Sequence, residues 1–169
     1  HASYERRVEL ERQLKEHFKI PHLYVVADPT NLAKRDDRVA AFAAIQAQSL
    51  IKQAKVVNLS WGETIFEVID HFVKTEQEEL TFAQFMGENM KYHSSTGSMR
   101  MVQRAAAKFG AHYFTIPGPL YILNDLVRRG FMAEPSIRRT LDVAKQADLI
   151  ISGIGTLESV DSIPLWNEN

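Results

Sequence analysis

The stretch KVVNLSWGETIFEVIDHF, from Lys55 to Phe72, decides the fold because it passes from a strand pattern directly into a helix pattern. Its first part, KVVNLS (Lys55 to Ser60), is a short apolar run that predicts a buried strand. After Gly62 the apolar residues recur at the three- and four-residue spacing of a helix. A strand that leads at once into a helix is the repeating unit of an α/β sheet.

The same alternation continues on both sides of this stretch. The predicted strands cover residues 22–27, 55–60, 80–86, 112–117 and 148–154. Helices are expected between them, including an amphipathic opening helix with Ser3 as its N-cap and a late helix with Ser136 as its N-cap. Strands that alternate with helices predict parallel crossovers, so we expect an α/β fold with a doubly wound, mostly parallel sheet and helices on both faces.

The predicted sheet ends without a final covering helix. After the strand at residues 148–154 comes only TLESVDSIPLWNEN, which is too polar and irregular for the helix that a buried parallel strand requires. The first residue is His1 rather than Met. We therefore expect residues 1–169 to form one domain, a fragment of a longer protein that is incomplete at its C-terminus.

Composition excludes several classes of function. The 20 Lys and Arg residues against 21 Asp and Glu leave no basic field for nucleic acid, and no run is apolar and long enough to span a membrane. The absence of cysteine favours a cytoplasmic protein. The histidines have no metal-ligand spacing, and GxGxxG, Walker and GxSxG motifs are absent, so we expect no metal, cofactor or catalytic nucleophile.

The first candidate site is the tip of the strand at residues 55–60. Ligands in open α/β sheets bind beyond the carboxyl ends of the strands, where helix N-termini offer free amides. The loop there provides two hydroxyls, a glycine and the first turn of a helix in Ser60, Trp61, Gly62, Glu63 and Thr64. These residues suit an anion-binding cradle, but they equally suit a tight turn with a capped helix, and Trp61 either covers a ligand or packs in the core.

Other strand tips offer weaker candidates. Gly153, Gly155 and Thr156 lie at the tip of the last predicted strand and leave little bulk between backbone and ligand, although a plain turn explains them as well. Gly87 begins a long polar loop up to Gly97 that has the length of a binding loop. The side chains in or beside these loops that offer charge are Asp28, Glu63, Glu88, Lys91, His93 and Arg100, although surface charges are usually only solvated.

Together these motifs resemble one family. The ordered segments are LERQLKEHFKIPHLYVV, SWGET after an apolar strand, FGAHYFTIPGPL, and EPSIRRTLDVAKQADLIISGIGT. In this order they resemble the effector-binding domain of SorC-type bacterial sugar-responsive transcriptional regulators, and the resemblance runs from end to end of the chain.

The resemblance implies a sheet similar to that of sugar-phosphate isomerases and glucosamine-phosphate deaminases, which binds a phosphorylated sugar as a signal without converting it. It also implies a homo-oligomer and a separate helix-turn-helix domain for operator DNA, which this chain does not contain. Glu63 departs from the family, since many relatives have a basic or hydroxyl side chain there. The ligand-binding residues that the resemblance implies are Ser60, Trp61, Gly62, Glu63, Thr64, Gly87, Gly153, Gly155 and Thr156.

Two other functions stay open at this point. A sugar-phosphate isomerase or deaminase of the same architecture would use the same phosphate loop, with nearby carboxylates as acid and base. An oligomerisation domain without a ligand of its own would need neither.

Overall fold

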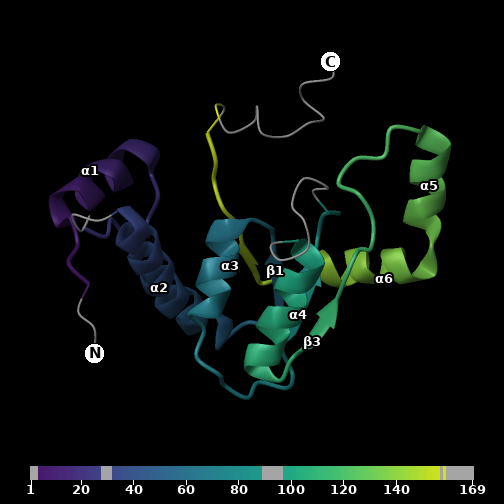
Figure 1. The fold of residues 1–169 in the computed structure, drawn as a ribbon, viewed down its shortest axis with the longest axis horizontal. Coiled ribbons are helices and arrows are strands. Elements are labelled where there is room, and N and C mark those ends of the chain that lie inside the picture. Colours follow the sequence, from purple (N-terminus) through teal and green to yellow (C-terminus); the bar gives the residue numbers. More distant parts are fainter. Residues whose placement is uncertain (1–3, 28–31, 89–96, 157, 159–169) are drawn as a thin grey trace.

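A computed structural model describes residues 4–27, 32–88, 97–156 and 158, and shows a four-stranded parallel sheet (Figure 1). The strand order is β3-β2-β1-β4. The strands are β1 (Val56–Leu59), β2 (Thr81–Gln84), β3 (His112–Phe114) and β4 (Leu149–Ile151). The expected parallel α/β sheet is therefore confirmed, and its four strands lie inside four of the five predicted segments.

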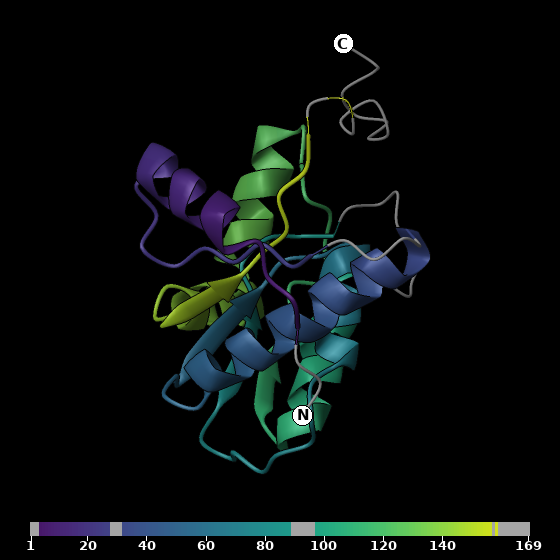
Figure 2. The same cartoon turned by 90° about the vertical axis from the view of Figure 1, so that its left-hand side faces the viewer.

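Six helices are described, and they cover both faces of the sheet. They are α1 (Val8–Phe18), α2 (Leu32–Ile51), α3 (Glu63–Asp70), α4 (Ser98–Phe109), α5 (Asp125–Ala133) and α6 (Pro135–Ala144). Helices α2, α3 and α4 pack together on one face, and α6 packs against β1 and β2 from the other. Figure 1 shows α1 and α5 at opposite ends of the long axis, and Figure 2, seen from the α1 side, shows α2 crossing in front of the strands.

The core lies between the sheet and the layer of α2, α3 and α4. Val57 and Leu59 of β1 are fully buried there, as alternation along a strand requires. The Phe109 ring lies 5.6 Å from the ring of Phe82 and 5.6 Å from that of Phe72. Asn58 points to the opposite face, where its side-chain amide donates to the Ala144 carbonyl of α6 at 2.9 Å.

Two polar side chains fix the sheet to its neighbours. The Asp148 carboxylate accepts from the backbone amides of Lys55 at 2.7 Å and Val56 at 3.0 Å, and these bonds lower the pKa of Asp148, the Val56 amide most. Gln84 is fully buried, and its side-chain carbonyl accepts from the Ile116 amide at 2.7 Å. The first pair joins the amino ends of β1 and β4, and the second holds the segment after β3 against β2.

The predicted strand at residues 22–27 is wrong. This segment pairs in antiparallel fashion with residues 5–7, through bonds from the Arg7 amide to the Val25 carbonyl and from the Ala27 amide to the Glu5 carbonyl, both 2.8 Å. These two hydrogen bonds form a single antiparallel bridge between Arg6 and Val26, so the segment pairs outside the main sheet. An apolar run indicates an extended segment without specifying its partner.

The N-terminal helix is held by a buried carboxylate rather than by its apolar stripe. Glu11 is only 2% exposed, and Arg6 donates to its two oxygens at 2.8 and 2.6 Å. The Val25 amide donates to the same carboxylate at 3.0 Å. These bonds, the Arg6 bond most, lower the pKa of Glu11 to about 2. Leu10 and Phe18, which lie on the apolar stripe of this helix, are exposed.

Helix starts differ from two of the predicted caps. Ser3 lies outside the described residues, and the N-cap position of α1 is Arg7. Ser136 is the second residue of α6 and not its N-cap, because Pro135 takes the first helical position, which suits a residue without an amide proton. The side chain of Asn124 caps α5 instead, accepting from the Leu126 and Val127 amides.

Candidate functional site

The candidate site lies at the carboxyl ends of β1 and β4. From β1 the chain proceeds through α3 to β2 on one side, whereas β4 pairs with β1 on the other side after α6 has crossed the opposite face. The strand order thus reverses between β1 and β4, which is the place where open α/β sheets bind ligands. The Ser60 amide donates to the Ile151 carbonyl at 3.0 Å, so the loops that follow these two strands start side by side.

The loop after β1 forms an open helix N-terminus. Gly62 occupies the N-cap position of α3 with φ 125°, a conformation that L side chains rarely adopt, and a Cβ built there would have nothing within 4 Å. Among the described residues no side chain caps this helix. Glu63 and Thr64 are exposed in its first turn. Within the described residues the first turn of α3 thus carries no side-chain cap, and uncapped amides at a helix N-terminus are where an anion would bind.

Ser60 adds a buried hydroxyl to this loop. It is 6% exposed, and its Oγ makes no hydrogen bond within the part of the chain that the structure describes. The Asn58 Oδ1, two residues earlier on the same face of β1, is buried and unbonded as well. A buried polar atom without a partner costs about 1–3 kcal/mol, so a ligand or water that bonded to it would recover that loss. Trp61, which follows, is half-buried.

The loop after β4 lies in the open. Gly153, Gly155 and Thr156 are exposed, and a Cβ on Gly153 would meet no atom within 4 Å. The strand ends at Ile151, three residues earlier than predicted, so these residues belong to the loop. The Glu158 carboxylate accepts from its own backbone amide and from the Thr156 hydroxyl. Both bonds lower the pKa of Glu158, the backbone amide more than the hydroxyl.

Gly87 at the end of β2 has a packing role. It is buried, and a Cβ there would lie 2.2 Å from the Pro119 carbonyl oxygen. Beside it, the Glu88 amide donates to the Gly118 carbonyl at 2.7 Å, and the Leu120 amide donates to the Glu88 carbonyl at 2.8 Å. Only glycine allows the two backbones this approach. Gly87 shapes the loop beside the site and presents no open surface, unlike Gly62.

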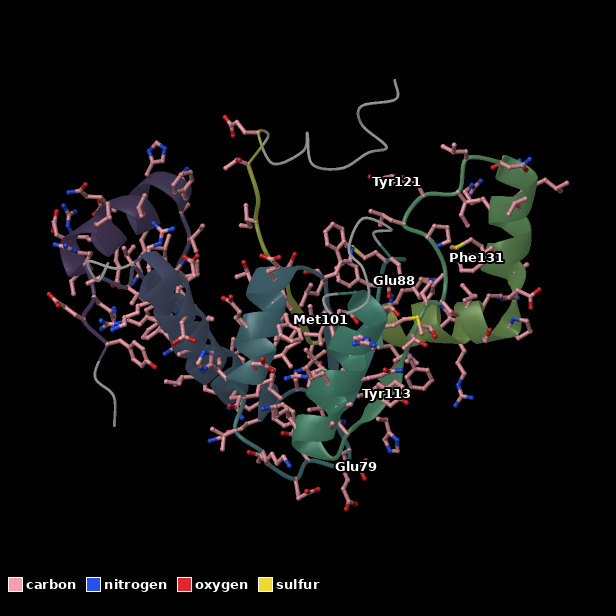
Figure 3. The ribbon with its side chains drawn as sticks, in the orientation of Figure 1. Glu79, Glu88, Met101, Tyr113, Tyr121 and Phe131 are labelled. Atoms are coloured by element: carbon pink, nitrogen blue, oxygen red, sulfur yellow. The ribbon has the colours of Figure 1, made fainter. Side chains whose placement is uncertain are left out.

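Glu88 closes the second helix N-terminus at this edge. Its carboxylate accepts from the Met99 amide in the first turn of α4 at 2.7 Å. Gly97 leaves the room for it, since a Cβ at Gly97 would lie 2.8 Å from the Glu88 Oε2. Figure 3 shows Glu88 at the end of α4 nearest the carboxyl edge. The α4 terminus thus carries a protein carboxylate, whereas no side chain of the described residues caps α3.

The remaining predicted side chains contribute less. Asp28, Lys91 and His93 lie outside the described residues, and Arg100 is exposed on α4. His71 contacts Asp37 at 2.8 Å. Within residues 4–27, 32–88, 97–156 and 158, no three His, Asp or Glu side chains gather as metal ligands, and no helix is long and apolar enough to cross a membrane.

Two hollows elsewhere in the described residues have mainly apolar linings, whereas a third, of about 500 Å³ beside β3, includes Thr81, His112 and Arg139. A groove of about 580 Å³ runs between residues 22–26, α2 and β4, and its lining is mainly apolar. A cavity of about 350 Å³ lies between the end of β2, residues 116–122 and helices α5 and α6, with Arg128 as its one charged lining residue. Sugar hydroxyls require polar partners, which the loops after β1 and β4 offer.

Sequence reasoning missed two features of the site. It could not identify Glu88 as the group that caps α4, because the carboxylate and the helix are separated by residues 89–96 and meet only in the folded chain. It also could not identify the unbonded Ser60 hydroxyl, since the burial of one side chain depends on which elements pack around it in the folded chain. The sequence carries no local signal for either.

Comparison with known proteins establishes the family. Residues 2–169 match the family model described as "Putative sugar-binding domain". The fold is shared with the full-length sorbitol operon regulator SorC from Klebsiella pneumoniae, with TM-score 0.81 and 20% identity over 88% of this chain and 49% of that one. A transcriptional regulator from Streptococcus pneumoniae gives TM-score 0.84 and 18% identity over 95% of this chain and 62% of that one.

The curated relatives are regulators too. This chain is 23% identical to the deoxyribonucleoside regulator of Bacillus subtilis over 145 residues, which are 85% of this chain and 46% of the relative. It spans about half the length of the curated relatives it matches. The chain belongs to the family of sugar-binding domains found in SorC- and DeoR-type transcriptional regulators.

Proposed function

We propose that this chain is the effector-binding domain of a bacterial transcriptional regulator and that its effector is a phosphorylated sugar. The observation that carries the proposal is the open N-terminus of α3 at the point where the strand order reverses, with Gly62 at φ 125° and free space above it. Free amides at a helix N-terminus favour a phosphate group. The family membership supports the sugar part of the effector.

The proposed binding residues divide into three roles. The amides after Gly62 and the hydroxyls of Ser60 and Thr64 bind the phosphate. The exposed backbone of Gly153, Gly155 and Thr156 faces the sugar from the loop after β4. Gly87 shapes the neighbouring loop, and Trp61 forms one side of the site.

Glu63 limits where the phosphate binds. Its carboxylate is exposed in the first turn of α3 and would repel a phosphate placed next to it. An exposed side chain can turn toward solvent or accept hydrogen bonds from sugar hydroxyls. We therefore assign Glu63 to the sugar and the amides of the same turn to the phosphate.

An enzyme of the same architecture is the alternative. Isomerases and deaminases need an acid and a base on opposite sides of the substrate. The Glu88 carboxylate accepts a bond from the Met99 amide, which favours a structural role for it. The curated relatives that this chain matches are both regulators by name, which favours binding without turnover.

In the whole regulator we expect effector binding to change the affinity of an attached helix-turn-helix domain for operator DNA. Such a protein works in the cytoplasm, where operator DNA is found, and we expect it to be a homo-oligomer. No metal or organic cofactor enters this proposal.

The proposal is tested by isothermal titration of this chain with a panel of sugar phosphates, the corresponding free sugars and inorganic phosphate. We expect a sugar phosphate to bind, and its free sugar to bind at least tenfold more weakly. Replacing Ser60 with Ala removes a buried, unbonded hydroxyl, so the melting temperature of the free chain should stay constant or rise while the affinity falls. The matched control is Ser49→Ala, which removes a hydroxyl on α2 far from the loop.

Two outcomes would contradict the proposal. Binding of no sugar phosphate, with an unchanged melting temperature at millimolar ligand, would favour an oligomerisation domain without a ligand. Steady conversion of a sugar phosphate in a coupled assay would favour the enzyme.

A further inference from the structure

The N-termini of α3 and α4 lie close together at the carboxyl edge of the sheet. Leu59 and Gln84, the last residues of β1 and β2, pair with each other, so the two strands end at the same level. Helix α3 begins four residues after Leu59, and the first turn of α4 is bound by Glu88, four residues after Gln84. The two helices pack against each other (Figure 1), and packed helices lie roughly 8–10 Å apart. A sugar with a phosphate group at each end therefore has the length to reach both termini.

The α4 terminus already holds a negative charge of the protein. The Glu88 carboxylate accepts from the Met99 amide at 2.7 Å, and Gly97 leaves the room for it. The backbone of Glu88 is fixed by two further bonds, from its amide to the Gly118 carbonyl at 2.7 Å and from the Leu120 amide to its carbonyl at 2.8 Å. A carboxylate held in this way bonds an amide that an external anion would otherwise bind, and its charge repels a second anion.

The α3 terminus has no such carboxylate on its amides. Within the described residues no side chain caps this helix. The Ser60 hydroxyl, two residues before the N-cap Gly62, is buried and makes no hydrogen bond in the described part of the chain. A phosphate group at this terminus gains amide partners without displacing a carboxylate of the protein.

Basic side chains are scarce along this edge. Among the described residues of the loops after β1, β2 and β4 and of the first turns of α3 and α4, Arg100 is the one basic residue, and it is exposed. The same set contains three carboxylates, those of Glu63, Glu88 and Glu158. Each phosphate monoester carries about 1.5–2 negative charges at pH 7, so a bisphosphate would bring twice that charge to an edge that is itself acidic.

We propose that Glu88 determines the specificity of the effector site, in that its carboxylate at the α4 terminus restricts the effector to a sugar with a single phosphate group. The inference rests on the proposed function, in which that phosphate binds at α3. Glu88 acts on the choice of ligand through its charge, whereas it stabilises α4 through its hydrogen bond to Met99. The two roles are separable, because a neutral acceptor preserves the hydrogen bond and removes the charge.

The test is isothermal titration of this chain with glucose 6-phosphate, fructose 6-phosphate and ribose 5-phosphate, each compared with the bisphosphate of the same sugar. We expect a monophosphate to bind at least tenfold more tightly than its bisphosphate. In Glu88→Gln the side-chain oxygen still accepts from the Met99 amide, so the melting temperature should be retained and the monophosphate affinity should stay within about threefold. The ratio of the two affinities should shift at least tenfold toward the bisphosphate, because the repelling charge is gone.

Two further variants control this result. Glu79→Gln removes the same charge from an exposed side chain near the far end of α4 (Figure 3) and should leave the ratio unchanged. Glu88→Ala removes both the charge and the cap, so it should lower stability and still shift the ratio in the same direction as Glu88→Gln. A purely structural role of Glu88 would weaken both ligands alike and would not change the ratio.

The outcomes separate this inference from the proposed function. If a monophosphate binds and the unmodified chain binds its bisphosphate equally well, the proposed function stands and the role of Glu88 is overturned. The same holds if neither Glu88 variant shifts the ratio. If no monophosphate and no bisphosphate binds, the proposed function itself fails, and the inference fails with it.

Discussion

The Ser60 amide and the Ile151 carbonyl are joined by a 3.0 Å hydrogen bond at the carboxyl end of the strand pair β1 and β4. This bond brings together two loops that are about ninety residues apart in sequence and belong to the two halves of the sheet. Because α3 covers one face and α6 the other, the space beyond this bond has a helix N-terminus on one side and the open backbone of residues 153–156 on the other. A small anionic ligand placed there contacts both halves.

Replacing Gly62 with Ala should weaken both ligand binding and folding. An L residue at φ 125° is strained, so the free energy of unfolding should fall by roughly 1–3 kcal/mol, and the displaced amides should reduce sugar-phosphate affinity at least tenfold. Urea denaturation and isothermal titration measure the two effects. The control for stability is Gly153→Ala, which meets open space and should change the unfolding free energy by less than about 0.5 kcal/mol. Affinity that survives in Gly62→Ala would place the anion elsewhere.

Glu88→Ala should destabilise the chain without removing the ligand site. The carboxylate caps α4 through the Met99 amide, and loss of a helix cap costs about 0.5–2 kcal/mol. We expect the midpoint of urea unfolding to fall and the sugar-phosphate affinity to stay within about threefold, less than the 1.4 kcal/mol that a tenfold change represents. If the chain instead turned over a sugar phosphate and this variant abolished the turnover, Glu88 would be an acid or base.

Gly87→Ala should destabilise the fold through a steric clash. A Cβ at 2.2 Å from the Pro119 carbonyl oxygen forces the two loops apart, and overpacking of this kind costs about 1–3 kcal/mol. The measurement is the free energy of unfolding in urea, with Gly153→Ala again as the control. Unchanged stability in Gly87→Ala would show that the loops separate easily and would contradict the packing role of Gly87.

The N-terminal helix should loosen in acid through Glu11. The pKa of Glu11 is about 2 in the folded chain against an ordinary 4.5, so its pairing with Arg6 stabilises the fold fully above pH 4.5 and loses that effect as the pH falls toward 2. The stability difference between the unmodified chain and Glu11→Gln, measured by urea unfolding, should therefore be constant above pH 5 and shrink below pH 4.5. A difference that stays constant down to pH 3 would contradict this account.

Much of the fold could be predicted because each sheet strand is a short apolar run bounded by turn residues, and a helical pattern follows every strand but the last. The segment at residues 22–27 has the same pattern, yet its partner is residues 5–7, and only the folded chain specifies which backbone an extended segment pairs with. The prediction of Ser136 as an N-cap was wrong because α6 already begins at Pro135. Local composition predicted the elements, whereas pairing and caps depended on neighbours.

For the site, the sequence identified the candidate loops but could not predict which of them lie side by side. Loops after parallel strands share one edge, which placed Ser60 to Thr64 and Gly153 to Thr156 at that edge. Their adjacency follows from β4 pairing with β1, which the order of elements along the chain does not determine. The separate role of Gly87 depends on Pro119, from a segment thirty residues later.

The pairing of Glu88 with residues 118–120 joins the tip of β2 to the segment that carries α5. Glu88 bonds through its amide and its carbonyl to that segment, and the ring of Phe131 rests on Gly118 within it. A shift of the β2 tip would therefore either break the two Glu88 hydrogen bonds or displace residues 118–120, which the Phe131 ring of α5 contacts. Residues 118–120 thus connect the tip of β2 directly with α5.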